Sequence, residues 1–427
     1  MVGKMDFPPM IRLKQNFEAP TIKDISGEIN AQINNLDLKE KVNAGETVAV
    51  ACSSRGIANY STIVRSTVDC LKDAGLQPFL FPAMGSHGAS TAEGQKRVLE
   101  NYGITEESMG APIQSSLEVV QIGETEDGIP IYIDKIANMA DYILPINRVK
   151  THTEFEHSIE SGLMKMLAIG LGKQKGATIY HQAVMVYGYP RVILSVSRQI
   201  ISTRKILFGV GIVENGYGQT ADIAVVGLEE LEVKEKELLV KSKRLAARLP
   251  FEQVDVLIID EMGKDISGTG FDTKVVGRIL MPLVADEPQS PQIKRIVVCD
   301  LTENTEGNAD GVGIADFVTK RLVEKIDMNA LRTNAIAGAE PEHARIPLAL
   351  RNDREAIDVA IQSVGLIRPD KLKIIRIKNT MALMEVDVSA AYRTELARRD
   401  DLEIIRDDWA FKFDGEGNRK PFHFFDS

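Results

Sequence analysis

One segment of the sequence gathers most of the side chains that could do chemistry. Residues 148–181, RVKTHTEFEHSIESGLMKMLAIGLGKQKGATIYH, hold three of the chain's six histidines, His152, His157 and His181. Apolar residues surround Lys165 on nearly every side. Such a lysine either snorkels to the surface or lies in a pocket where desolvation frees its amine as a nucleophile. The segment therefore predicts a site for covalent attachment or, alternatively, a structural lysine.

The three histidines of this segment predict different roles. His152 and His157 are five residues apart and do not share one face of a helix. We expect them in a loop, with at most one of them catalytic. His181 is a suitable ligand for nickel, copper or zinc. Because one histidine cannot hold a metal ion alone, either His152 or His157 joins it or a bound organic cofactor supplies the other ligands.

The run GLGKQKG separates Lys165 from His181. Its glycines, Gly170, Gly172 and Gly176, predict a backbone that packs closely against a partner such as a phosphate. The run is not a Walker motif, because the spacing and the Ser/Thr of that motif are missing.

Two further candidates follow predicted strands. Arg55, in ACSSRG, could bind a carboxylate or phosphate through both arms of its guanidinium, or be a surface arginine in a turn. His87, in PAMGSHGAST, could act as an acid or base near neutral pH, with Gly85 and Gly88 letting the backbone approach a ligand. Alternatively, His87 caps the helix that follows.

Strand patterns alternate with helical patterns through the first half of the chain, which predicts a parallel sheet. We expect strands over 46–54, 142–149, 205–216 and 222–228, a further strand with its exit loop over 77–88, and helices over 61–75 and 90–103, the latter with Ser90 as N-cap and Gly103 as C-cap. Arg55, His87 and His152 follow the first three strands. Ligands of such sheets bind at the carboxyl ends of strands.

A long charged amphipathic helix over 229–250, ending at Pro250, marks the predicted domain junction. Beyond it we expect strands over 254–263, 295–302 and 373–380, and helices over 313–326 and 354–365. The prediction is two Rossmann-like α/β domains, residues 1–250 and 251–427. The first would carry the residues described above, and the second would close the active-site cleft between them.

Composition narrows the class of protein. The formal net charge of −10 argues against non-specific nucleic-acid binding. No apolar run is long enough to span a bilayer, and the N-terminus lacks the apolar core of a signal peptide, so we expect no membrane partner and a cytoplasmic location. The three cysteines form no CxxC pair, which argues against a disulfide framework or a structural zinc site.

These residues, in this order, resemble those of the lactate racemase family of 2-hydroxyacid racemases and epimerases. SGLMK is similar to the family segment whose lysine tethers the cofactor, which implies that role for Lys165. The family's nickel ligand lies sixteen positions after that lysine, and His181 stands there. The resemblance implies the family's cofactor, a nickel pincer nucleotide (pyridinium-3,5-bisthiocarboxylic acid mononucleotide nickel), covalently tethered.

The same resemblance implies roles for three residues that precede the tether. KTH matches one catalytic histidine of the family and GSHGAST the other, so His152 and His87 would be the two bases. SSRG matches the arginine that binds the substrate carboxylate, which would be Arg55. The distance from His152 to Lys165 is longer than in lactate racemases, so His157 stays a rival.

In the second domain, EMGKDISGTGFDTKVVGR occupies the substrate-facing region, where Lys264 or Lys274 would bind substrate. The resemblance implies an isomerase that inverts a 2-hydroxyacid by removing and returning a hydride. Its partners would be the small-molecule 2-hydroxyacid and the enzymes that make the cofactor. Two alternatives stay open: a zinc-dependent hydrolase or lyase using the histidines of 152–181, and a family homologue that is non-catalytic or acts differently.

Overall fold

The computed structural model describes residues 7–54, 56–85, 87–420 and 422, and they form two compact units. The N-terminal unit consists of residues 18–152 and 156–246. The C-terminal unit takes the described residues before 18, residues 153–155 and those from 247 onwards. The chain passes from the N-terminal to the C-terminal unit between residues 246 and 247, within the range predicted for the junction helix. The segments before 18 and at 153–155 were expected in the first domain instead.

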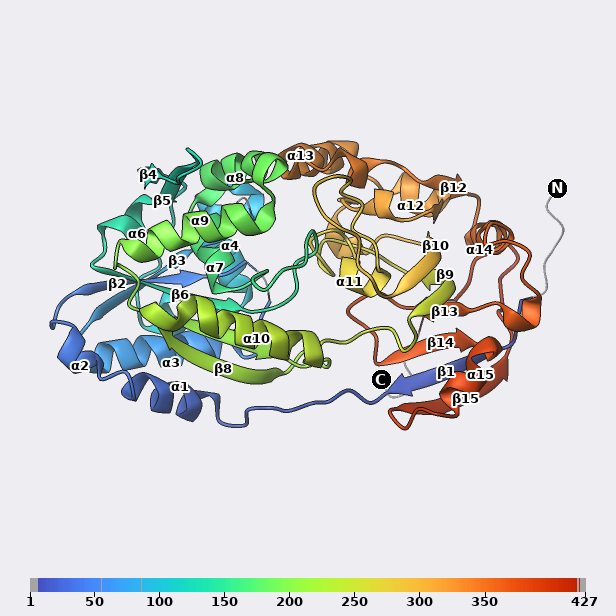
Figure 1. The fold of residues 1–427 in the computed structure, drawn as a ribbon, viewed down its shortest axis with the longest axis horizontal. Helices are drawn as coiled ribbons and strands as arrows, with labels where there is room; N and C mark the ends of the chain where they lie inside the picture. Colours follow the sequence, from blue (N-terminus) through green and yellow to red (C-terminus); the bar gives the residue numbers. More distant parts are fainter. Residues whose placement is uncertain (1–6, 55, 86, 421, 423–427) are drawn as a thin grey trace. The chain divides into compact units, whose positions relative to one another are not determined.

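A five-stranded sheet in the order β3-β2-β6-β7-β8 forms the centre of the N-terminal unit (Figure 1). Its strands are β2 (Thr47–Cys52), β3 (Gln77–Pro82), β6 (Tyr142–Arg148), β7 (Phe208–Glu214) and β8 (Thr220–Gly227). The first four strands in this order run parallel, and β8 is antiparallel to β7. All five strands were predicted from the sequence. A two-stranded hairpin, β4 (Val119–Glu124) with β5 (Pro130–Asp134), stands beside the sheet.

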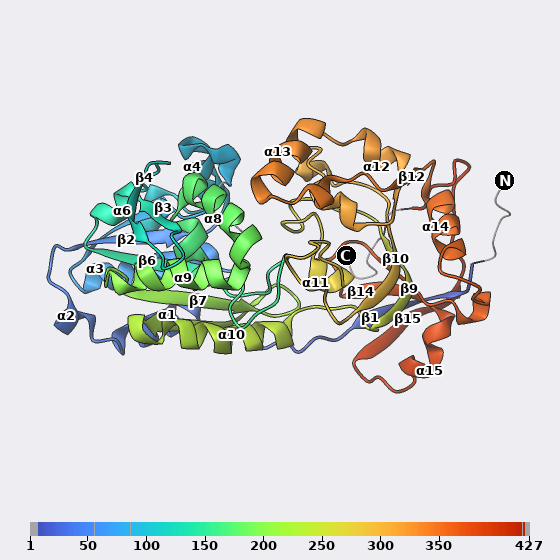
Figure 2. The ribbon, with the colours of Figure 1, turned by 45° about the horizontal axis from the view of Figure 1, so that its top comes forward.

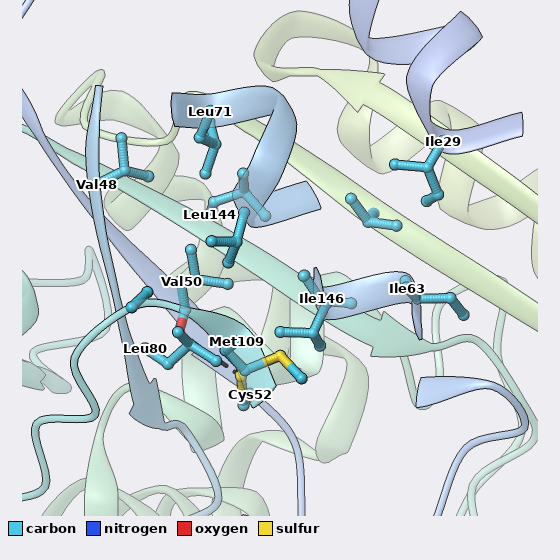
Figure 3. Packing of buried hydrophobic residues seen from close by; sticks show 14 of the residues in the cluster. Ile29, Val48, Val50, Cys52, Ile63, Leu71, Leu80, Met109, Leu144 and Ile146 are labelled. Carbon is cyan, nitrogen blue, oxygen red and sulfur yellow. Dashed lines mark hydrogen bonds between the residues drawn. The ribbon is translucent and has the colours of Figure 1, made fainter. Parts of the chain in front are cut away.

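Helices cover both faces of this sheet. They are α1 (Ile25–Asn34), α2 (Leu38–Lys41), α3 (Tyr60–Asp73), α4 (Ala92–Asn101), α5 (Glu106–Met109), α6 (Lys135–Met139), α7 (Leu163–Lys165), α8 (Lys173–Tyr187), α9 (Tyr189–Ser202) and α10 (Leu231–Leu245). On one face, Ile29 of α1 and Ile63 of α3 pack with Val48 and Val50 of β2, as Figure 3 shows. Each such side chain, fully buried, contributes roughly 1.5–3 kcal/mol to folding.

The opposite face is shaped by glycine. A Cβ on Gly209 of β7 would stand 2.9 Å from Leu163 of α7 and 3.3 Å from Leu231 of α10. These two helices can therefore lie directly on the strand. Helix α7 opens the connection from β6 to β7, which continues through the π-helix η2 (Met166–Gly170) into α8 and α9.

The C-terminal unit is built on an eight-stranded sheet in the order β12-β11-β10-β9-β13-β14-β1-β15. Its strands are β1 (Met10–Gln15), β9 (Gln253–Ile259), β10 (Gln292–Val298), β11 (Phe317–Thr319), β12 (Leu348–Leu350), β13 (Ile374–Ile377), β14 (Glu385–Ser389) and β15 (Leu402–Trp409). The first five strands in this order are parallel and the last three are joined by antiparallel pairs. The unit's longer helices are α13 (Met328–Gly338) and α14 (Asp353–Gln362), and α14 packs on one face of the sheet (Figure 2).

Strand β1 explains why the start of the chain belongs to the C-terminal unit. It pairs with β14 on one side and β15 on the other. Arg12 lies opposite Asp387 in the register, and its guanidinium donates to both carboxylate oxygens of Asp387 at 2.7 and 2.9 Å. A boundary that leaves all of residues 1–250 in one domain would break these pairs.

Two local predictions were wrong. Residues 313–326 were expected as one helix, but Phe317–Thr319 form β11 and only Lys320–Glu324 form helix α12. Phe317 and Val318 pair in parallel with β10, which satisfies their backbone groups without a helix. The N-cap of α4 is Thr91 and not Ser90, because the Thr91 hydroxyl accepts from the N–H of Gly94 at 3.0 Å.

The described part of the chain includes no helix with both the length and the apolar character needed to span a membrane. The coarse prediction of a mixed α/β protein is confirmed.

Candidate functional site

Lys165 ends a short helix whose start is held by a buried carboxyl group. Glu235, from α10, accepts at Oε2 from the backbone N–H of Met164 at 2.8 Å. A Cβ on Gly162 would lie 2.5 Å from Glu235 Oε1, so any larger residue there would displace this carboxyl group. Burial raises the pKa of Glu235 to about 7, although the N–H groups of Met164 and Leu163 lower it. The helix that presents Lys165 is thus fixed by a residue from far along the chain.

The segment after Lys165 continues as a π-helix, a form that often occurs at functional sites. The side chain of Lys165 is half-buried, so it is neither fully exposed nor completely enclosed in the core. Its Nζ contacts Nε2 of His152. The predicted neighbourhood of an amine and an imidazole is therefore present in the N-terminal unit.

His152 is only 4 % exposed, and its position is fixed through its backbone. Its N–H donates to Glu160 Oε2 at 2.7 Å, and the other oxygen of this fully buried carboxylate pairs with Lys243 at 2.5 Å. Anchoring by the backbone leaves the imidazole to face Lys165.

Tyr189, at the start of α9, joins His152 to His181. Its ring centroid lies 5.4 Å from that of His152 and 6.4 Å from that of His181. His181 lies on α8, half-buried. The sequence analysis missed Tyr189. The available signal was its place between Gly188 and Pro190, a helix start directly after the segment with the histidines.

His157 lies apart from this group. It is exposed, and its ring nitrogen Nδ1 is 3.4 Å from the hydroxyl of its neighbour Ser158. Among the residues that the structure describes, no three His, Cys, Asp or Glu side chains are grouped so that they could hold a metal ion.

The backbone of the glycines between Lys165 and His181 packs closely, as expected, and the partners found for it are other parts of the protein. A Cβ on Gly170 would meet the carbonyl oxygen of Ala83 at 2.7 Å. A Cβ on Gly172 or Gly176 would meet the ring of Tyr180 at 2.9 or 3.0 Å. The space beside these glycines is already filled by the protein itself.

His87 lies in the loop after β3, directly before the 3-10 helix η1 (Gly88–Ser90), and its side chain is exposed. It makes no side-chain capping hydrogen bond to that helix. Gly88 has a φ of +65°, and a Cβ there would stand 2.6 Å from the backbone nitrogen of Gln95. Gly88 thus permits the close approach of this loop to α4. Arg55, the predicted carboxylate-binding residue, lies outside the described residues.

The two lysines predicted to bind substrate lie in the C-terminal unit. Lys264 donates to the carbonyl of Gly268 at 2.5 Å in the loop after β9, and it pairs at 2.7 Å with Asp310 in the loop after β10. Lys274 is half-buried on the helix α11 (Thr273–Val276). The hydroxyl of Thr273, beside it, donates to the carbonyl of Thr153.

In this α/β protein the amine of Lys165 contacts the imidazole of His152, and the ring of Tyr189 lies near the imidazoles of His152 and His181. An amine so placed can form a covalent bond, and an imidazole can transfer a proton or bind a soft metal ion. Residues 10–190 match the family model of the lactate racemase N-terminal domain. The match includes His87, His152, Lys165 and His181.

Solved structures show the same fold at low sequence identity. The lactate racemase apoprotein from Thermoanaerobacterium thermosaccharolyticum is 13 % identical with a TM-score of 0.51, over 88 % of this chain and 99 % of that one. A crystal structure of a protein from Thermotoga maritima is 14 % identical with a TM-score of 0.51, over 86 % and 99 %. The comparison with curated proteins found no match.

Proposed function

We propose that this protein is a racemase or epimerase of a 2-hydroxyacid that carries a nickel pincer nucleotide tethered to Lys165. The observation that carries the proposal is the contact between Lys165 Nζ and His152 Nε2, next to Tyr189 and His181, in a lactate racemase-type domain. The family match supports the reaction class, and the residues in place fit the cofactor. Which hydroxyacid is converted is a matter for a substrate screen.

The donor set suits the proposed cofactor. Lys165 offers a half-buried primary amine at the end of a fixed helix, as a covalent tether requires. His181 offers a single imidazole, and a cofactor that brings its own donor atoms needs only one from the protein. When bound, the cofactor would supply the group that accepts hydride from the substrate and returns it.

The protein's own side chains would bind the substrate and move its proton. His152 presents Nε2 toward the tether, so this nitrogen would take the hydroxyl proton of one enantiomer as hydride leaves it, and would return the proton when that enantiomer re-forms. His87 would serve the second enantiomer. Arg55 would hold the carboxylate while the reacting carbon turns, and Lys264 or Lys274 would supply a further positive charge to the substrate.

The deciding experiment measures intact mass and metal content of protein produced together with the enzymes that make the cofactor. We expect one mass increment and about one nickel per chain, both lost in Lys165→Ala. Lys175→Ala is the matched control, because this lysine lies on the same segment but is exposed over the ring of Tyr132. It should keep both.

Other outcomes would replace the proposal. Unmodified protein with stoichiometric zinc would indicate a direct metal site, for which His152, His157 and His181 were the sequence candidates. Nickel and an intact tether without turnover of any hydroxyacid would indicate a non-catalytic homologue.

A further inference from the structure

The loop that carries His87 is packed directly against the segment that carries Lys165 and His181. A Cβ on Gly85 would lie 3.4 Å from Ile169 of η2, and one on Gly170 would meet the Ala83 carbonyl at 2.7 Å. Backbone therefore lies against backbone here. Such packing brings the two segments close, but it does not by itself fix the direction in which the loop presents His87.

A buried lysine stands at this junction. Lys173, the first residue of α8, is fully buried, and its backbone has a left-handed φ of +53°. Its ammonium pairs with Asp134 at 3.0 Å and donates to the carbonyl of Pro82, the last residue of β3. Asp134 is fully buried too, and it caps α6 by accepting from the N–H of Ala137 at 2.9 Å. A strained backbone and a buried ion pair both cost free energy, so the arrangement needs a structural or functional reason.

Gln95 extends this ion pair to the loop. It lies on α4 with no exposed surface, and its Oε1 accepts from Lys173 Nζ at 3.4 Å. Its amide nitrogen donates to the carbonyls of Gly85 at 2.9 Å and His87 at 3.2 Å. An ammonium group can only donate. Lys173 therefore sets which way the amide points, because a reversed amide would place its N–H groups against the ammonium and its oxygen against two carbonyls.

We propose that Lys173 and Gln95 are positioning residues that hold the backbone of His87 against the segment of Lys165 and His181. Neither residue touches the reacting atoms; they act through the carbonyls of Gly85 and His87. The inference depends on the proposed function only for the role of His87 as a base. The network itself consists of contacts within the N-terminal unit.

The test uses the full chain without cofactor or substrate, so it stands or falls separately from the racemase proposal. Gln95→Met keeps the volume and removes both ends of the amide. Leu99→Met is the matched control, since Leu99 lies one turn later on α4 and is equally buried, but it is outside the network. Two quantities are measured: the ring NMR signal of His87, assigned by its absence in His87→Asn, and hydrogen exchange at the amides of His87, Ser90 and Thr91. Those amides donate to Met84, His87 and Gly88 in the native loop.

In Gln95→Met we expect a shifted His87 ring signal and exchange at these amides faster by about tenfold or more. The signals of the remaining histidines and the exchange of β2 should not change. Leu99→Met should leave the loop as in the wild type. If Gln95→Met gives wild-type values for both quantities, the proposal is wrong.

A second variant separates positioning from stability. Lys173→Met alone leaves Asp134 buried and uncompensated, and this variant can fail to fold for that reason. The double variant Lys173→Met with Asp134→Asn removes the buried charges and keeps an oxygen to cap α6. We expect the double variant to recover a wild-type melting temperature and still to show the altered His87 signal and the fast exchange. Recovery of stability together with a wild-type loop would overturn the role of Lys173.

Discussion

The contact with Lys165 favours His152 over His157, which the sequence alone left as alternative candidates for the catalytic histidine. His152 is buried and faces the amine, whereas His157 is exposed beside Ser158. In the loaded enzyme we expect His152→Asn to lower kcat by about 10²–10⁴-fold, the usual contribution of a general acid–base group. His157→Asn, the matched control, should stay within about twofold of the wild type. The measurement is the racemisation rate of whichever hydroxyacid the screen identifies, and comparable losses in both variants would contradict the assignment.

His181 and Lys165 have separable tasks if one binds the metal and the other the organic part of the cofactor. We expect His181→Ala to keep the mass increment on Lys165 while the bound nickel falls well below one per chain, because the tether does not depend on the imidazole. Gln182→Ala, the exposed neighbour on α8, should retain both. Intact mass and metal analysis of the same sample decide the matter. Loss of the mass increment in His181→Ala would show that metal binding precedes attachment.

Candidate residues can be selected from the sequence where spacing along the chain carries the information, and the roles given to them stay predictions. Lys165, His152 and His181 stand out by residue type and by their separation in one segment. Tyr189 and Glu235 did not, because they reach the site by packing; Glu235 lies 71 residues from the Met164 that it contacts. A glycine is ambiguous in the same way, since the sequence does not say which atoms will fill the space beside it.

The helix that presents Lys165 depends on its buried cap, and this gives a pH dependence. Glu235 holds its proton to a pH of about 7, because burial raises its pKa from the ordinary value of 4.5. The unfolded chain releases that proton at lower pH. Stability should therefore fall as the pH rises from about 4.5 to about 7, by roughly 3 kcal/mol from this residue, and then level off.

Glu235→Gln removes that titration. We expect the free energy of unfolding of this variant not to fall as the pH rises. Relative to the wild type, its stability should therefore improve by roughly 3 kcal/mol from pH 4.5 to pH 8. Denaturant unfolding at several pH values, followed in the N-terminal unit, measures the difference. Glu237→Gln, an exposed position on the same helix, is the control and should parallel the wild type. If Glu235→Gln also runs parallel to the wild type, the carboxyl group is not titrating as described.

Elements were predicted well where periodicity and burial agree. The strand β2 lies between two others and is buried on both faces, so its unbroken apolar run has only one reading. The region 313–326 has apolar residues at helical spacing, yet pairing with β10 takes three of its residues into the sheet. Short segments like this one are decided by a neighbour that the local sequence does not contain.

Each of the two units packs its buried apolar residues against its own sheet, and strand β1 belongs to the sheet of the C-terminal unit. Nothing local in MIRLKQ indicates a partner nearly four hundred residues away. The pairing is nevertheless specific, because Arg12 is 8 % exposed and Asp387 fully buried, with each satisfying the other. Removing one partner of a buried, bidentate pair leaves an uncompensated charge and typically costs about 3–5 kcal/mol.

We therefore expect Asp387→Ala to destabilise the C-terminal unit by about 3–5 kcal/mol, and the double variant Arg12→Met with Asp387→Leu to recover only part of that loss, because the fully buried Glu385, 3.9 Å from Arg12, then loses this guanidinium. Arg376, which also approaches Asp387 at 3.4 Å, keeps its own pair with Asp260 at 2.6 Å in both variants. Hydrogen exchange read strand by strand gives the location of the effect. Protection should fall in β1, β9 and β14 and persist in β2 and β6, since a unit with its own core can stay folded while another opens. Equal loss in both sets of strands would mean that the two units unfold together, and Lys165 would then depend on a strand at the far end of the sequence.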